Sequence, residues 1–165
     1  MVKQRYLINS AAPRLIHQRR LLWLCLLLLA SCASIPPYDR ADYNFHSYRP
    51  GTNVGFYSGQ VCEDIEIDHV VSLSEAHYAG AWRWPSEQKE AFANDRSNHV
   101  AACASINRSK GSSTPSDFLR RSQDGEGVDF VFVDFCGYVA RYVAVKEAYL
   151  LSIESIDEEL LESCN

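Results

Sequence analysis

Acidic side chains are absent from the first 31 residues of this 165-residue sequence, and long apolar runs are absent as well. A membrane-spanning helix needs about 20 apolar residues, whereas the run at 21–30 has ten. Basic residues precede this run, and the small residues Ala30 and Ser31 end it. These features are typical of a secretory signal, so we expect residues 1–31 to be removed; an uncleaved anchor helix is the alternative.

The four residues at 29–32 (LASC) resemble a bacterial lipobox. In that class of signal the cysteine, here Cys32, becomes the new N-terminus and carries the lipid. Because Ala33 rather than aspartate follows, the resemblance implies export and a lipid anchor in the outer membrane of a Gram-negative cell. Residues 32–43 would then be the lipidated cysteine and a polar tether, and 44–165 the single folded domain.

Positive charge is scarce once residues 1–31 are set aside. They hold five of the 16 Lys and Arg residues, so 11 remain against 21 Asp and Glu, a net charge of -10. This balance argues against binding nucleic acid through a generally basic surface. Any contact with phosphate must come from a local basic cluster and a metal ion.

Cysteine pairs of the Cys-x-x-Cys type are also absent, which argues against a zinc ribbon. Of the six cysteines, Cys25 falls within the expected signal and Cys32 is the expected lipidation position. An even number in an exported domain predicts two disulfides, which four cysteines can form in three ways. The four are Cys62, Cys103, Cys136 and Cys164.

Alternation of polar and apolar residues over 64–68 predicts a half-buried strand with His69 at its end. Residues 98–102 form a second predicted strand. Helix formers and terminal signals predict helices at 73–81, 86–93, 104–110 (closed by Gly111), 137–151 and 155–163. Residues 44–60 are expected to be loop, 111–115 a polar stretch, and 129–135 either a strand or the approach to a helix.

The predicted strands at 64–68 and 98–102 and the predicted helix at 104–110 give the order strand, strand, helix. This order resembles the ββα-metal (His-Me) finger of HNH nucleases. The run DIEIDHVVSLSEA…FANDRSNHVAACASINRSKG is similar to the HNH-type C-terminal domain of the GmrSD restriction-endonuclease family, as are FCGYVARYVAVKEAY and the terminal Cys164. The resemblance covers residues 38–164. It implies an α+β fold in which a ββα-metal finger is embedded in a mostly helical, disulfide-braced single domain.

The resemblance implies cleavage of phosphodiester bonds, and the residue types suit that reaction. A neutral histidine accepts a proton near pH 7, which suits His69 as general base. A divalent cation, most suitably Mg²⁺, is held by one or two oxygen ligands plus waters, which suits Asp68 and Asn107. Neighbouring residues on a strand point to opposite faces, so we expect the chain to bend after Asp68 if both residues serve one site.

Asn98 corresponds to the middle asparagine of HNH motifs and is expected to hold the loop after His69 by side-chain hydrogen bonds. Ser72 stands where the related sequences usually have proline, a departure that concerns the geometry of this loop. His77 and His99 are expected to be surface or packing histidines rather than metal ligands.

Arg108 and Lys110 are expected phosphate contacts, with Arg120–Arg121 as a weaker second patch. The alternative is that these charges are merely solvated on helix surfaces.

The expected function is that of a metal-dependent HNH endonuclease acting outside the cytoplasm on nucleic acid, DNA rather than RNA. The alternative is a non-catalytic outer-membrane lipoprotein that uses the HNH scaffold as a binding module. The acidic charge favours the binding module somewhat. The joint presence of Asp68, His69, Asn98 and Asn107 favours the nuclease more.

The finger also predicts a disulfide pairing. If residues 62–69 and 97–103 are the antiparallel arms of its hairpin, with His69 near Asn98, then Cys62 lies toward Cys103 on the other arm. The last two helices would form a second hairpin turning near residue 153. We therefore predict the pairs Cys62–Cys103 and Cys136–Cys164.

Overall fold

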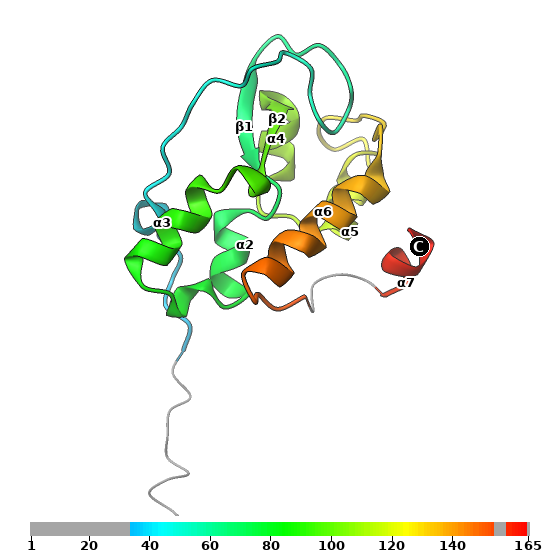
Figure 1. Ribbon diagram of the computed structural model, residues 1–165. Coiled ribbons are helices and arrows are strands. Elements are labelled where there is room, and N and C mark those ends of the chain that lie inside the picture. The colour runs from blue at the N-terminus through cyan, green and yellow to red at the C-terminus, as the bar shows by residue number, and fades with distance from the viewer. Residues whose placement is uncertain (1–33, 154–157, 165) are drawn as a thin grey trace, which may run out of the picture. The chain divides into compact units, whose positions relative to one another are not determined.

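The computed structural model describes residues 34–153 and 158–164 (Figure 1). The expected signal sequence and Cys32 lie outside the described residues. None of the helices in these two ranges is long and apolar enough to cross a membrane.

The centre of the fold is a two-stranded antiparallel sheet. Strand β1 (Ile65–His69) pairs with β2 (His99–Cys103), in a register that places Ile65 opposite Cys103 and His69 opposite His99. The two strands are far apart in sequence because helices are inserted between them. These are α2 (Leu73–Tyr78), η2 (Ala81–Arg83), α3 (Ser86–Asn94) and η3 (Arg96–Asn98). The predicted α+β class, mostly helical with one short sheet, is confirmed.

Helix α4 (Ala104–Lys110) begins immediately after β2 and packs against both strands. It ends at Gly111, whose φ of 53° lies in the left-handed region that favours glycine. Figure 1 shows α4 beside the strand pair, with α2 and α3 on one side of it and α5 and α6 on the other. The strand–strand–helix order therefore corresponds to a compact arrangement in space.

The C-terminal part contains three helices: α5 (Pro115–Arg121), α6 (Phe135–Ala148) and α7 (Glu158–Ser163). Helix α5 is absent from the prediction, although Thr114 caps it by accepting a hydrogen bond from the amide of Asp117. Residues 129–134 are the irregular approach to α6, the second of the two predicted alternatives.

The hydrophobic core is rich in aromatic side chains that meet edge to face. Tyr57 lies at its centre, with its ring centroid 5.0 Å from that of Phe118 and 5.3 Å from that of Tyr138. Tyr43 is fully buried in the same core, at the end of the 3-10 helix η1 (Arg40–Tyr43). The compact unit begins at Ile35, and Tyr43, which lies within the predicted tether at 32–43, packs into its core.

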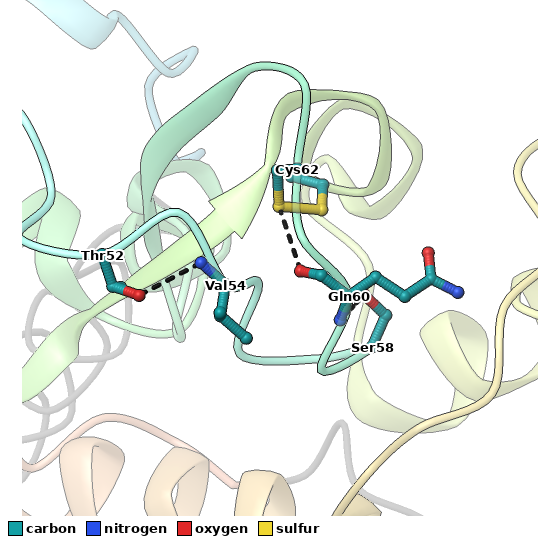
Figure 2. Close-up of a disulfide and its surroundings, with 6 residues drawn as sticks. Thr52, Val54, Ser58, Gln60 and Cys62 are labelled. Carbon is teal, nitrogen blue, oxygen red and sulfur yellow. Dashed lines mark hydrogen bonds between the residues drawn. A yellow bond between two sulfur atoms is a disulfide. The ribbon is translucent and has the colours of Figure 1, made fainter.

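Both predicted disulfides are present, Cys62–Cys103 and Cys136–Cys164. The first joins the segment before β1 to the end of β2. Figure 2 shows it next to the loop at 52–60, where the Thr52 hydroxyl accepts a hydrogen bond of 3.1 Å from the amide of Val54. A Cβ at Gly55 would lie 3.0 and 3.1 Å from the two sulfurs, so this loop approaches the disulfide closely because residue 55 is glycine.

Candidate functional site

His69 ends β1, and its imidazole is almost completely buried. Its Nε2 lies 2.8 Å from the carbonyl oxygen of Ala93. A carbonyl oxygen only accepts, so Nε2 carries the proton and Nδ1 keeps a free lone pair. The ring edge is fixed by Phe45 and His99, whose ring centroids each lie 4.7 Å from that of His69. The structure therefore presents Nδ1 as the proton acceptor.

His99 supports this arrangement from the opposite strand. Its Nε2 lies 2.9 Å from the same Ala93 oxygen, which has lone pairs for both rings, and its Nδ1 accepts from the Tyr48 hydroxyl at 3.2 Å. His99 is thus a packing residue, as predicted. His77 is one too, since its ring nitrogens contact the Tyr43 hydroxyl and the Pro36 carbonyl.

Burial lowers the pKa of His69 to about 3, while its hydrogen bond to Ala93 acts in the opposite direction and the neighbouring His99 and Lys110 lower the pKa further. Burial also lowers the pKa of His99. Both rings are therefore neutral at neutral pH. In the unfolded chain a histidine takes up its proton near pH 6.5. The free energy of unfolding should therefore decrease as the pH falls from about 6.5 toward 3.

Asp68 lies behind His69 in a buried ion pair with Lys110. The Lys110 ammonium lies 3.0 Å from Oδ2 of Asp68 and also donates to the His69 carbonyl at 2.7 Å. The Tyr57 hydroxyl donates to the same Asp68 oxygen at 2.5 Å. Because Lys110 is fully buried, its prediction as a phosphate contact is corrected: its charge is used inside the protein.

Glu66 is the residue that the sequence reasoning missed. Its Oε2 accepts a hydrogen bond of 2.9 Å from the side-chain amide of Asn107, and its Oε1 lies 3.6 Å from the guanidinium of Arg108. Its side chain is 40% exposed, whereas that of Asp68 is 6% exposed. The alternation of β1 could have identified it, because Glu66 and Asp68 share one face of the strand.

The donor set permits a test of the predicted metal site. Mg²⁺ prefers carboxylate and amide oxygens and is often held by one or two protein groups plus waters. Glu66 and Asn107 fit this chemistry, because they are in contact and partly exposed. Asp68 does not fit in this conformation, because Lys110 already neutralises its carboxylate. Within 34–153 and 158–164, no group of three or more His, Cys, Asp or Glu side chains is placed to hold a metal ion.

Asn98 holds the loop that follows His69. Its side-chain oxygen accepts from the Val71 amide at 2.8 Å, its side-chain nitrogen donates to the Val71 carbonyl at 3.0 Å, and its own carbonyl accepts from Val70. This is the geometry predicted for Asn98. Ser72, in the position of the usual proline, caps α2 by accepting from the Glu75 amide. The serine therefore fixes the end of the same loop in another way.

Three adjacent cavities surround these residues. The central cavity, about 330 Å³, is lined by Asp68, His69, Asn107 and Arg108 among others. A cavity of about 900 Å³ shares Asn107 with it, and a cavity of about 530 Å³ shares Arg108. The predicted base and Asn107 therefore line one depression, which continues on both sides.

Comparison with known proteins identifies one relative and no family. An uncharacterized secreted protein of Arthroderma benhamiae is 34% identical over 102 residues, which cover 61% of this chain and 46% of that protein. The chain thus spans about half the length of this relative. No protein-family model matches the sequence, and no solved structure matches it significantly.

Proposed function

We propose that this chain is a metal-dependent endonuclease of the HNH type, which hydrolyses phosphodiester bonds of nucleic acid, DNA rather than RNA. In this proposal β1, β2 and α4 form the ββα-metal finger. The observation that carries it is the environment of His69: the Ala93 carbonyl accepts from Nε2–H, which leaves Nδ1 as the nitrogen able to accept a proton, and His69 is among the residues that line the central cavity.

We further propose that the protein acts outside the cytoplasm. Two disulfides are typical of oxidising compartments, and the relative from Arthroderma benhamiae is named as secreted. A lipid on Cys32 and anchoring in an outer membrane are the finer part of this proposal, supported by the sequence at 29–32.

In the reaction, Nδ1 of His69 takes the proton of the attacking water. The low pKa keeps the ring unprotonated over the physiological range, and a nearby anionic phosphate would raise that pKa toward the value that suits a general base. Through its hydrogen bond to the His69 carbonyl, Lys110 fixes the backbone that carries the base. Asp68 is then a positioning residue that holds Lys110.

Glu66 and Asn107 are the residues that would hold the divalent metal, most suitably Mg²⁺. When bound, such an ion neutralises charge on the phosphate and stabilises the leaving oxygen. Arg108, which is exposed beside Glu66, would contact a phosphate.

The alternative proposal is a non-catalytic binding module. One observation favours it. Asp68 pairs with Lys110, Asn107 with Glu66 and Asn98 with Val71, so these three motif residues have structural partners. His69 favours the enzyme, because it lines the central cavity and its hydrogen bond to Ala93 leaves Nδ1 as the unprotonated nitrogen.

The test is nicking of supercoiled plasmid by the full chain, purified with its disulfides intact. We expect nicking that requires Mg²⁺ and that falls by about 10²–10⁴-fold in His69→Ala, the usual contribution of a general base. His46→Ala is the matched control, because the His46 side chain is exposed, lies 3.7 Å from the Glu90 carboxylate and lines none of the three cavities. Equal nicking by wild type and His69→Ala would refute the assignment. Full nicking in excess chelator would refute the metal.

A further inference from the structure

The few exposed cations of this acidic protein are not spread evenly. In the parts that the structure describes, seven Lys or Arg side chains are exposed: Arg40, Arg49, Arg83, Arg96, Arg108, Arg120 and Arg121. Five of them line the three adjacent cavities, and Arg83 and Arg96 do not. The exposed cations of the described residues are therefore concentrated along the central cavity, which His69 lines, and the two cavities that flank it.

Within this set the arginines gather on one side of the central cavity. Arg108 from α4 and Arg120 and Arg121 from α5 line the cavity of about 530 Å³. Two acidic residues line it too, Asp124 and Glu126, so the balance is three positive against two negative charges. The cavity on the other side has two arginines against three acidic residues (Arg40 and Arg49 against Glu63, Asp64 and Glu66). Of these two flanking cavities, only the one lined by the three arginines has more positive than negative side chains.

The three guanidinium groups are held in place by contacts that leave donors free. Arg121 donates to the Ser109 carbonyl at 2.8 Å, which ties α5 to α4. Arg120 pairs with Asp124 at 3.2 Å, and Arg108 lies 3.6 Å from Glu66. Each guanidinium has five N–H donors, so donors remain for a ligand, and the planar fork suits phosphate oxygens.

We propose that Arg108, Arg120 and Arg121 form a subsite for a backbone phosphate of the nucleic-acid strand, next to the position where the strand is cut. Arg108 lines both this cavity and the central one, so it connects the subsite with His69. The inference rests on the proposed function and extends it: the protein recognises the shared backbone phosphates of DNA or RNA, on one side of the cut.

The experiment measures binding rather than cleavage. Fluorescein-labelled 12-nucleotide single strands of DNA and of RNA are titrated with the His69→Ala protein in chelator, and anisotropy is followed at several salt concentrations. Arg120→Gln and Arg121→Gln are each introduced into this protein. Arg83→Gln is the charge-matched control, because Arg83 is exposed, lies over the Trp82 ring and lines none of the three cavities.

We expect each subsite variant to raise Kd on the order of tenfold, the loss of about one charged hydrogen bond. The slope of log K against log salt should also decrease by about 0.7–0.9 per lost contact. Arg83→Gln should change neither quantity. The losses should be the same for DNA and RNA, because the phosphate is common to both.

Binding by Arg120→Gln and Arg121→Gln equal to that of Arg83→Gln would overturn the subsite, as would a loss confined to DNA or to RNA. Thermal unfolding checks folding; if Arg121→Gln is unfolded because its bond to Ser109 is lost, Arg120→Gln decides, since its partners are surface carboxylates. Arginine-dependent binding without nicking by the wild type would refute the nuclease and not the subsite. Nicking with arginine-independent binding would refute the subsite alone.

Discussion

Replacing Lys110 with methionine tests the buried ion pair at the centre of the fold. The Lys110 ammonium is fully buried, and its contacts are both carboxylate oxygens of Asp68 and the His69 carbonyl. Methionine fills nearly the same space but removes the charge and all of these hydrogen bonds. The Asp68 carboxylate would remain buried without the ammonium group, and it would keep its hydrogen bond from the Tyr57 hydroxyl.

The expected loss is large because the two partners are so well buried. Removing one member of a buried ion pair typically costs about 3–5 kcal/mol, since the other charge is left without compensation. A domain of this size has a total stability of about 5–15 kcal/mol, so K110M should lose a substantial part of it. Adding Asp68→Asn removes the orphaned charge. The free energy of unfolding of the double variant should therefore decrease by about 2 kcal/mol or more less than the sum of the two single losses.

The assay is urea unfolding at pH 7.5, followed by circular dichroism with both disulfides oxidised. Arg108→Met is the control, because Arg108 is exposed on the same helix, and its free energy of unfolding should stay within about 0.5 kcal/mol of the wild type. If K110M were as stable as R108M, Lys110 would not be the buried partner of Asp68, and a surface role toward phosphate would be favoured instead. Additive losses in the double variant would equally contradict the pairing.

Two further predictions concern the neighbours of this pair. The pKa of His69 is lowered to about 3, so its contribution to the free energy of unfolding should fall by about 2–3 kcal/mol from pH 7.5 to 4.5. In urea titrations at the two pH values, the free energy of unfolding of His69→Gln should therefore decrease by that much less than that of the wild type. Equal pH dependence of the two proteins would contradict the low pKa. Glu66→Gln should weaken Mn²⁺ binding measured by calorimetry on the order of tenfold, whereas its exposed neighbour Glu63→Gln should not; equal Mn²⁺ affinities would remove Glu66 from the ligand set.

The elements around the sheet follow from short-range patterns, and so they were predictable. Alternation identifies β1, and Gly111 with its positive φ marks the end of α4. The pairing of Cys62 with Cys103 then follows from the antiparallel register. The start of α5 has an equally local signal in Thr114–Pro115, a capping residue followed by proline at the first turn, which the prediction assigned to a polar stretch instead.

The roles of charged and aromatic residues could not be predicted in the same way, because burial depends on distant segments. Tyr43 is buried in the core, where its hydroxyl contacts His77, 34 residues later in the sequence. Lys110 lies four residues after Ile106, on the face of α4 that meets β1, and its partner Asp68 is 42 residues earlier in the sequence. A lysine in a polar sequence is most often solvated, so sequence alone favours the wrong environment here.

The spacing of the motif itself has a structural explanation in the contact between β1 and α4. On a strand, residues i and i+2 lie on one face about 6.6 Å apart, and on a helix residues i and i+3 lie on one face about 4.5 Å apart along the axis. Glu66 and Asp68 are such a pair on β1, and Asn107 and Lys110 are such a pair on α4. The contacts join them in order, Glu66 with Asn107 and Asp68 with Lys110. His69 continues the β1 ladder as the partner of His99, and it lines the same cavity as Asp68 and Asn107. The two pairs therefore fix α4 along β1, and the base is positioned by the backbone that this contact holds.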